Sequence, residues 1–262
     1  MKDSARRMGL ARAVSKLGYC SRSQAAELIR AGRVSLEGII CRDPETPVRS
    51  LESQIAVDGK VIEAREKLYF MLNKPRGVIT TASDEKGRQT VYALLGRHSA
   101  NPAGTVGEME PWIAPVGRLD KASEGLLLLT NDSEWAARIT APETHLDKTY
   151  HVQVAAVVDE CFIQLLLRGV KAMTGEVLRA KRAQRLRAGE KHCWLEIVLD
   201  EGKNRHIRRM MESLGVEVLR LMRVAIGPLQ LGDLAKRKYR ALTADEKRRL
   251  DRALSERNSK AK

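Results

Sequence analysis

The run of four leucines at residues 126–129 constrains the fold more than any other feature of the sequence. Gly125 precedes it and the polar residues Thr130, Asn131 and Asp132 follow it. A short, continuous apolar run between turn-forming residues is typical of a buried strand. No apolar stretch of the chain approaches the roughly 20 residues that a membrane-spanning helix needs. The sequence therefore predicts a globular domain built around a buried strand, without a transmembrane segment.

Strand-like and helix-like segments are mixed along the chain from residue 67 onward. A weakly patterned stretch at residues 99–112, which contains two prolines and two glycines, is predicted to be a surface insertion. Because strands and helices do not alternate regularly, the pattern favours an α+β fold over a doubly wound sheet. Strands are predicted at residues 69–72, 126–129, 150–154, 194–199 and 216–226, and helices after Ser133 and at residues 161–167 and 204–214.

The first 63 residues are predicted to form a separate small domain. Gly18 and Gly32 each end a stretch with apolar residues at helical spacing, and Ser21 with Gln24 has the pattern of a capping box. Short strands follow, and residues 64–67 are predicted to be a linker. We therefore expect domains at residues 8–63 and 67–245, followed by a basic C-terminal tail at residues 246–262.

The net charge of +14 indicates a polyanionic partner. The chain has 47 Lys and Arg against 33 Asp and Glu, an excess larger than solubility requires. Such an excess favours nucleic acid, because cations that neutralise phosphates release counterions. The tail is expected to add affinity for phosphate without reading bases. In the first domain, a basic face is predicted from Arg12, Arg22, Arg30 and Arg33.

The four cysteines give no sign of a metal site or a disulfide. Cys20, Cys41, Cys161 and Cys193 lie far apart, and the five histidines are not at ligand spacing from them. We therefore expect reduced thiols, no metal and no cofactor. The basic N-terminus is not followed by the apolar segment of a signal peptide, so a cytoplasmic protein is expected.

Asp120 is the strongest candidate for a reactive group. It lies beside Arg118 in a glycine-flanked loop that leads directly into the buried strand, and loops held by a rigid strand commonly present reactive side chains. An aspartate that caps a turn is the alternative interpretation. A second charged segment, at residues 200–211, contains Lys203, Arg205 and Arg208 at the start of a helix, where they favour contact with RNA. Arg208 would alternatively reach inward to a carboxylate.

The motif at residues 117–120, Gly-Arg-Leu-Asp, followed by residues 125–132, resembles the signature of the RsuA/RluB/RluE/RluF-type ribosomal RNA pseudouridine synthases. Residues 12–34 resemble an S4 RNA-binding domain. The resemblance implies a small N-terminal S4 domain of the αL type, followed by a catalytic domain with a mixed, mainly antiparallel sheet. Four further blocks agree in order and spacing, at residues 72–77, 148–152, 201–210 and 219–227.

The resemblance implies a role for each matching residue. Asp120 would be the catalytic aspartate, Tyr150 the ring beside the target uracil, and Arg208 the partner that holds Asp120. Arg118 would help to fill the gap left by a flipped base, and Leu221 would pack near the uracil. The matching basic segments predict further RNA contacts from Lys74, Lys203 and Arg205. Three positions depart from the family pattern, namely Ser123, Ser133 and His206, and none of them removes a proposed catalytic group.

The implied reaction is the isomerisation of uridine to pseudouridine, which needs no second substrate. Asp120 would either attack C1′ or remove a proton from C2′, and the sequence does not choose between them. The partner would be ribosomal RNA or a ribosome assembly intermediate, bound by a monomer. Large-subunit RNA is favoured over small-subunit RNA by the residues around Asp120 and Tyr239.

Two other functions compete with this interpretation, namely a catalytically inactive RNA-binding assembly protein and an RNA nuclease. A nuclease would need paired carboxylates or a histidine pair, and the sequence has no clear pattern of either.

Overall fold

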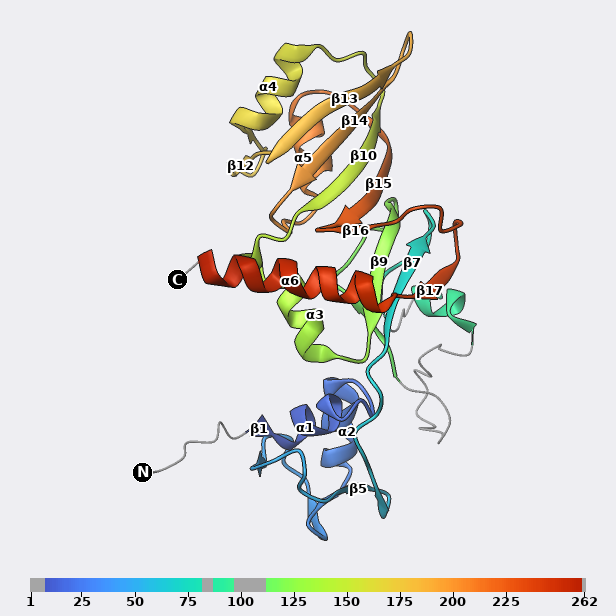
Figure 1. The fold of residues 1–262 in the computed structure, drawn as a ribbon, viewed down its shortest axis with the longest axis vertical. Coiled ribbons are helices and arrows are strands. Elements are labelled where there is room, and N and C mark those ends of the chain that lie inside the picture. Colours follow the sequence, from blue (N-terminus) through green and yellow to red (C-terminus); the bar gives the residue numbers. More distant parts are fainter. Residues whose placement is uncertain (1–7, 82–86, 97–111, 261–262) are drawn as a thin grey trace.

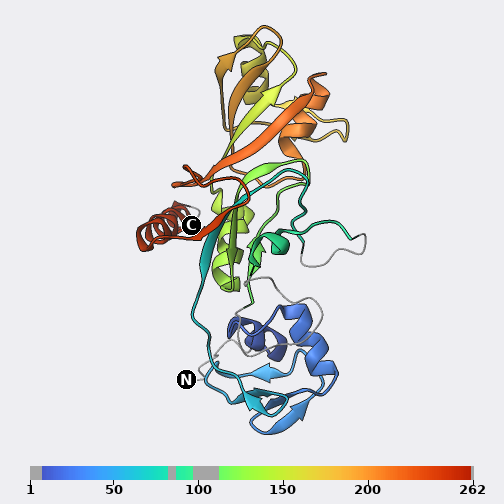
Figure 2. The ribbon, with the colours of Figure 1, turned by 90° about the vertical axis from the view of Figure 1, so that its right-hand side faces the viewer.

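The computed structural model describes residues 8–81, 87–96 and 112–260 (Figure 1). These residues form a small N-terminal domain, drawn in blue, and a larger domain that extends from it along the long axis of the molecule (Figures 1 and 2). The predicted insertion at residues 99–112 falls outside these ranges except for Trp112. In the described part of the chain, no helix has the length and apolar character needed to cross a membrane.

The N-terminal domain packs helices α1 (Leu10–Lys16) and α2 (Arg22–Arg30) against short antiparallel strands. At the start of α2, the Ser21 hydroxyl accepts a hydrogen bond from the Gln24 backbone, and the Gln24 side chain accepts one from the Ser21 backbone. The predicted capping box is therefore confirmed. The strands are β1 (Met8–Gly9), paired with β4 (Pro47–Val48), and a sheet in the order β3 (Ile39–Cys41), β2 (Val34–Leu36), β5 (Ile55–Val57) and β6 (Lys60–Val61).

The larger domain is built on one mixed sheet. Its neighbouring strands are β13 (Arg182–Ala188), β14 (Cys193–Leu199), β10 (Lys148–Val154), β15 (Val218–Ile226), β9 (Glu124–Thr130), β7 (Tyr69–Lys74) and β17 (Tyr239–Ala241), while β16 (Leu229–Gln230) pairs with β15 and β8 (Ala114–Val116) with β9. Only the β15–β9 pair is parallel among the described strand pairs of this sheet. The α+β fold class with a mainly antiparallel sheet is confirmed.

Strand β9 lies in the centre of the domain, and all seven of its residues are buried. It contains the four leucines that predicted a buried strand. Its second residue, Gly125, has a φ of +103°, and a Cβ atom there would lie 2.2 Å from the carbonyl oxygen of Arg223. No larger residue fits this position, because the backbones of β9 and β15 approach each other too closely.

Helices cover the sheet in separate regions. Helices α4 (Glu160–Arg168) and α5 (His206–Ser213) share one apolar cluster with β10 and β14. Helices α3 (Ser133–Thr140) and α6 (Ala244–Lys260) pack against Leu126 and Leu128 of β9. Leu127 and Leu129 point to the opposite face, where the short helix η1 (Val91–Leu94) packs. A two-stranded hairpin of β11 (Val170–Lys171) and β12 (Val177–Leu178) lies outside the large sheet.

Helix α6 corrects the predicted domain boundary at residue 245. That boundary falls inside the helix, whose Leu250 and Leu254 are buried in the apolar cluster around β9. The indole nitrogen of Trp135 also donates a 2.9 Å hydrogen bond to Asp251. The helix continues to Lys260, inside the segment that was predicted to be a tail. Residues 246–254 therefore belong to the larger domain, because two leucines at helical spacing anchor them.

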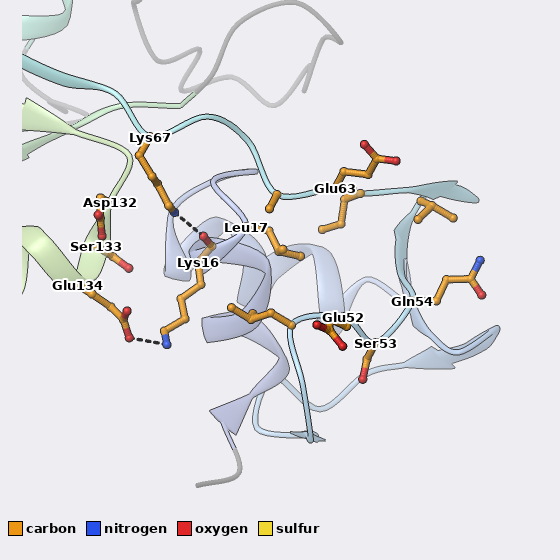
Figure 3. Close-up of a pocket in the computed structure, with 14 residues that line it drawn as sticks. Lys16, Leu17, Glu52, Ser53, Gln54, Glu63, Lys67, Asp132, Ser133 and Glu134 are labelled. Atoms are coloured by element: carbon orange, nitrogen blue, oxygen red, sulfur yellow. Dashed lines mark hydrogen bonds and ion pairs between the residues drawn. The ribbon is translucent and has the colours of Figure 1, made fainter. Parts of the chain in front are cut away.

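The two domains meet through a small set of contacts beside α3. Lys16 pairs with Glu134, the Lys67 ammonium donates a 2.7 Å hydrogen bond to the Lys16 carbonyl, and the Arg65 amide donates one to Leu17. A cavity of about 570 Å³ opens at this junction, and Figure 3 shows at its edge the Lys16 side chain reaching Glu134 and the Lys67 side chain reaching the backbone of Lys16. None of the predicted catalytic residues lines this cavity.

Candidate active site

Asp120 lies in a second cavity, of about 400 Å³, in the larger domain. Tyr150 of β10, Leu221 of β15 and Arg118 also line it, so the structure brings four of the predicted site residues together. The basic segment before α5 closes another side with Lys203 and Arg205. Residues that are far apart in the sequence meet here because β10, β15 and β9 are neighbours in the sheet.

The loop that carries Asp120 is held in place by its backbone. The Ser123 amide donates a hydrogen bond to the Asp120 carbonyl, and the Gly77 amide donates one of 2.7 Å to Lys121. The Thr80 hydroxyl donates to the Leu119 carbonyl at 2.9 Å. The Asp120 side chain remains about one third exposed, at 31%. A fixed backbone with an accessible carboxylate is suited to presenting a reactive group to a bound substrate.

Lys74 is part of this support, and its predicted contact with RNA is wrong. Its side chain is fully buried at the end of β7. The ammonium donates hydrogen bonds to the carbonyls of Ser123 at 2.7 Å and of Pro75 and Asp120 at 3.1 Å. Burial lowers the pKa of Lys74 to about 8, while the nearby carboxylates of Asp120 and Glu124 oppose this shift. All three donors of the ammonium are used inside the protein, so none remains for phosphate.

Tyr150 and Leu221 form the apolar side of the cavity. Tyr150 is half-buried and packs on the cluster beneath α4 and α5, and Leu221 is 7% exposed. Their strands pair directly, with Val152 opposite Leu221 and Tyr150 opposite Arg223. An aromatic ring fixed in this way offers a flat face on which a planar base can stack.

Arg205, rather than Arg208, is the cation nearest to the carboxylate of Asp120. One Arg205 nitrogen lies 4.0 Å from an Asp120 oxygen, and the Arg205 side chain is half exposed. Arg208 instead donates to the backbone carbonyls of Ala122 at 2.9 Å and Val218 at 3.4 Å. The predicted direct pair between Arg208 and Asp120 is therefore absent from the described residues. The family pattern placed Arg208 correctly beside the loop, but its guanidinium holds the backbone and not the carboxylate.

Arg205 reaches the site from an unusual backbone conformation. It precedes α5 with a φ of +48°, in the left-handed region that non-glycine residues rarely adopt. Lys203 is held by ion pairs to Glu201 at 2.6 Å and Glu176 at 3.4 Å, and the hydrogen bond that Lys203 donates to Glu201 raises the pKa of Lys203. Sequence reasoning missed Glu176, since it lies on the distant β11–β12 hairpin and no local spacing links it to the cavity.

His206 differs from the family pattern and is buried at the first position of α5. Neither ring nitrogen has a hydrogen-bond partner among the described residues. Burial lowers the pKa of His206, and the charge of Lys203 acts in the same direction. The neutral ring is therefore favoured, which avoids placing an unpaired charge in this site.

Comparison with known proteins supports the resemblance seen in the motifs. Residues 68–213 match the RNA pseudouridylate synthase family, and residues 8–55 match the S4 domain. The ribosomal large subunit pseudouridine synthase B of Bacillus subtilis (strain 168) is 35% identical over 253 residues, which cover 96% of this chain and 98% of that protein. The chain belongs to the RNA pseudouridine synthase family. An RNA pseudouridine synthase of Aquifex aeolicus (strain VF5) is 34% identical over 92% of both chains.

The architecture of this pseudouridine synthase also has a match among solved structures. A crystal structure of a pseudouridylate synthase aligns with 93% of this chain and 99% of its own, at a TM-score of 0.62 and 30% identity. The chain is thus an isomerase that converts uridine to pseudouridine in RNA, joined to an S4 domain.

The S4 domain of this pseudouridine synthase exposes the four arginines that were predicted to contact RNA, which are Arg12, Arg22, Arg30 and Arg33. Arg33 pairs with Asp58 at 2.6 Å and Arg22 with Glu45 at 3.1 Å, so both are already partly neutralised. Arg12 and Arg30 have no ion pair within the described ranges. These two arginines are therefore the better candidates for phosphate contacts.

Removing residues 1–63 should weaken binding to a ribosomal RNA fragment by roughly tenfold or more, because several phosphate contacts are lost together. The unfolding temperature of the remaining domain should change little, since few contacts cross the junction. Affinity measurements and thermal unfolding of the truncated protein check both expectations. Full-length Arg12→Gln/Arg30→Gln is the matched variant, and it should show part of the same loss. Unchanged affinity in both proteins would mean that this domain does not bind RNA.

Proposed function

We propose that this protein isomerises one specific uridine of large-subunit ribosomal RNA, with Asp120 as the reacting carboxylate. The observation that carries the proposal is the cavity that holds Asp120, Tyr150 and Leu221 beside the cations Arg118 and Arg205. The choice of large-subunit RNA rests on the Bacillus subtilis relative, which is named for that subunit. The protein is expected to act as a monomer in the cytoplasm, where ribosomal RNA is its partner.

The reaction breaks the C1′–N1 bond of the uridine, turns the uracil and joins C1′ to C5. The proton lost from C5 is balanced by the proton gained at N1, so no atom leaves the nucleotide. Asp120 either forms a bond to C1′ or accepts the proton from C2′ while the uracil is detached. A paired uridine must first leave its helix, at a cost of a few kcal/mol.

The other residues of the cavity would position the nucleotide. Tyr150 would stack on the uracil and Leu221 would pack on its edge, in a space shielded from water. Arg205 would keep the Asp120 carboxylate oriented while no substrate is bound. Arg118 would occupy the gap that the flipped base leaves in the RNA. The Lys74 ammonium and the Arg208 guanidinium would not contact the substrate. They would position Asp120 indirectly, because both hold the backbone of the loop that carries it.

Mapping pseudouridine in ribosomal RNA tests the proposal. A strain without the protein should lack one pseudouridine in large-subunit RNA, and the purified protein should restore it in RNA from that strain. Loss of a small-subunit modification would assign the enzyme to the other subunit. An unchanged pattern, together with no product from the purified protein, would favour an RNA-binding assembly role.

A further inference from the structure

A basic surface occupies the face of the large sheet opposite to the catalytic cavity. Side chains alternate between the two faces of a strand. Leu195 and Leu221 point into the cluster under α4 and α5, so Trp194 and Arg220 point away from it. Trp194 belongs to none of the apolar clusters formed by the described residues. We define the Trp194 surface as Arg187, Trp194, Arg220 and Lys236.

Trp194 fixes two of the cations of this surface. The guanidinium carbons of Arg187 and Arg220 lie 5.2 and 5.5 Å from the centre of its ring, within the range of cation–π attraction. The Arg220 side chain remains 44% exposed. Two arginines that would otherwise sample many rotamers are therefore held in place with donors available, which lowers the entropic cost of binding an anion.

Glu124 fixes the third cation. Its buried carboxylate accepts hydrogen bonds from Arg220 at 2.9 Å and pairs with Lys236 at 2.6 Å, while the Lys236 side chain stays 53% exposed. Burial alone would raise the pKa of Glu124, but the hydrogen bonds from Lys236 and Arg220 hold that pKa below its ordinary value. Arg220 and Lys236 share the single carboxylate of Glu124, and Arg187 has no ion pair among the described residues, so the cations of the Trp194 surface are only partly neutralised.

The Trp194 surface lies next to the support of the catalytic loop. Glu124 follows Ser123 directly, and the Lys74 ammonium bonds to Ser123 and Asp120. The segment that carries Lys236 is tied to β7, since the Asn73 side chain donates a 2.7 Å hydrogen bond to Leu234. A strand of RNA that enters the cavity therefore has a short path around the ends of β9 and β15 to this face.

We propose that the Trp194 surface binds the phosphate backbone of the ribosomal RNA that flanks the target uridine. The proposal rests on the proposed function for the identity of the RNA. Phosphate is favoured over bases because the two guanidinium groups already lie against the Trp194 ring, while their outer N–H groups suit phosphate oxygens. The surface contributes affinity and orientation, and it leaves the choice of uridine to the cavity.

The test compares Arg187→Gln/Lys236→Gln with the matched control Arg138→Gln/Arg168→Gln, which removes two exposed charges from α3 and α4. Affinity is measured against salt for a long large-subunit RNA fragment and for a minimal stem-loop with the same uridine. The Arg187→Gln/Lys236→Gln variant should bind the long fragment roughly tenfold more weakly, with a salt slope reduced by about 1.5, because two phosphate contacts are lost. The minimal stem-loop and the control should show little change.

Trp194→Leu provides a second measurement that does not alter charge. It should weaken binding of the long fragment because Arg187 and Arg220 lose their support, and Trp194→Phe should restore part of the affinity. Equal losses in the control, or unchanged affinity in Arg187→Gln/Lys236→Gln, would overturn the proposal. Pseudouridine formation on the minimal stem-loop is assayed in parallel. If the wild type forms none, the proposed function fails, while the binding data still decide the role of the surface.

Discussion

Asp120→Asn should abolish isomerisation, with no product above background after prolonged incubation. The amide has the shape of the carboxylate but neither attacks C1′ nor accepts the C2′ proton. Affinity for RNA should stay within a few-fold of wild type, since among the described residues the Asp120 carboxylate makes only a 4.0 Å contact with the half-exposed Arg205. Pseudouridine formation and RNA binding are measured on the same fragment.

Asp233→Asn is the matched control, because Asp233 is exposed and does not line the cavity. It should retain full activity and affinity. Measurable turnover by pure Asp120→Asn protein would falsify the assignment of Asp120 as the reacting group. Loss of RNA binding together with activity would show instead that the carboxylate organises the RNA surface.

Lys74→Met should disrupt the catalytic loop and destabilise the larger domain. The carbonyls of Pro75, Asp120 and Ser123 would lose their buried donor, and each unsatisfied buried group costs about 1–3 kcal/mol. The unfolding temperature should fall by on the order of 10 °C, since about 1 kcal/mol shifts it by roughly 2–4 °C in a domain of this size. The kcat value should fall more than KM rises, because the loop that places Asp120 is no longer fixed.

Lys121→Met is the control for that variant, because Lys121 is exposed on the same loop. It should leave stability and kcat nearly unchanged.

The pH dependence of stability gives a second measurement of the burial of Lys74. Because the folded-state pKa of Lys74 is about 8, below its ordinary 10.5, the folded protein releases this proton first. The contribution of Lys74 to the free energy of unfolding should therefore rise from about pH 8 to pH 10.5, and Lys74→Met should lack this rise. Identical pH profiles would contradict the burial of Lys74.

Local sequence patterns predicted the helices and strands that depend on interactions between residues close in the sequence. The four leucines predicted strand β9, and Ser21 with Gln24 predicted the start of α2. Asp120 could be selected because a reactive loop before a buried strand is a recurrent arrangement. The start of α3 was misplaced by one residue, because Asp132 and not Ser133 accepts the capping hydrogen bond from Trp135.

The features that sequence patterns missed depend on long-range pairing. A lysine before a Pro-Arg-Gly loop is equally compatible with solvent, and the acceptors that bury Lys74 include residues more than 40 positions away. The sequence placed Arg205 and Arg208 together at the start of a helix, and it did not indicate that Arg205, with its left-handed backbone, is the one that approaches Asp120. Strand β13 has no apolar alternation, and it forms because β14 supplies its hydrogen-bond partners.

The pairing of β7 with β17 has a consequence for the order of events during synthesis. It joins Met71 to Arg240, so the catalytic sheet lacks its edge strand β17 until residues 239–241 have been synthesised and have left the ribosome. The contacts that complete the S4 domain lie within the N-terminal part of the chain, such as the pairing of Met8 with Val48, so this domain can fold early. Because pairing of distant strands is slow, maturation of the catalytic domain should trail that of the RNA-binding domain. A nascent chain can therefore hold RNA through its S4 domain before it is competent to modify it.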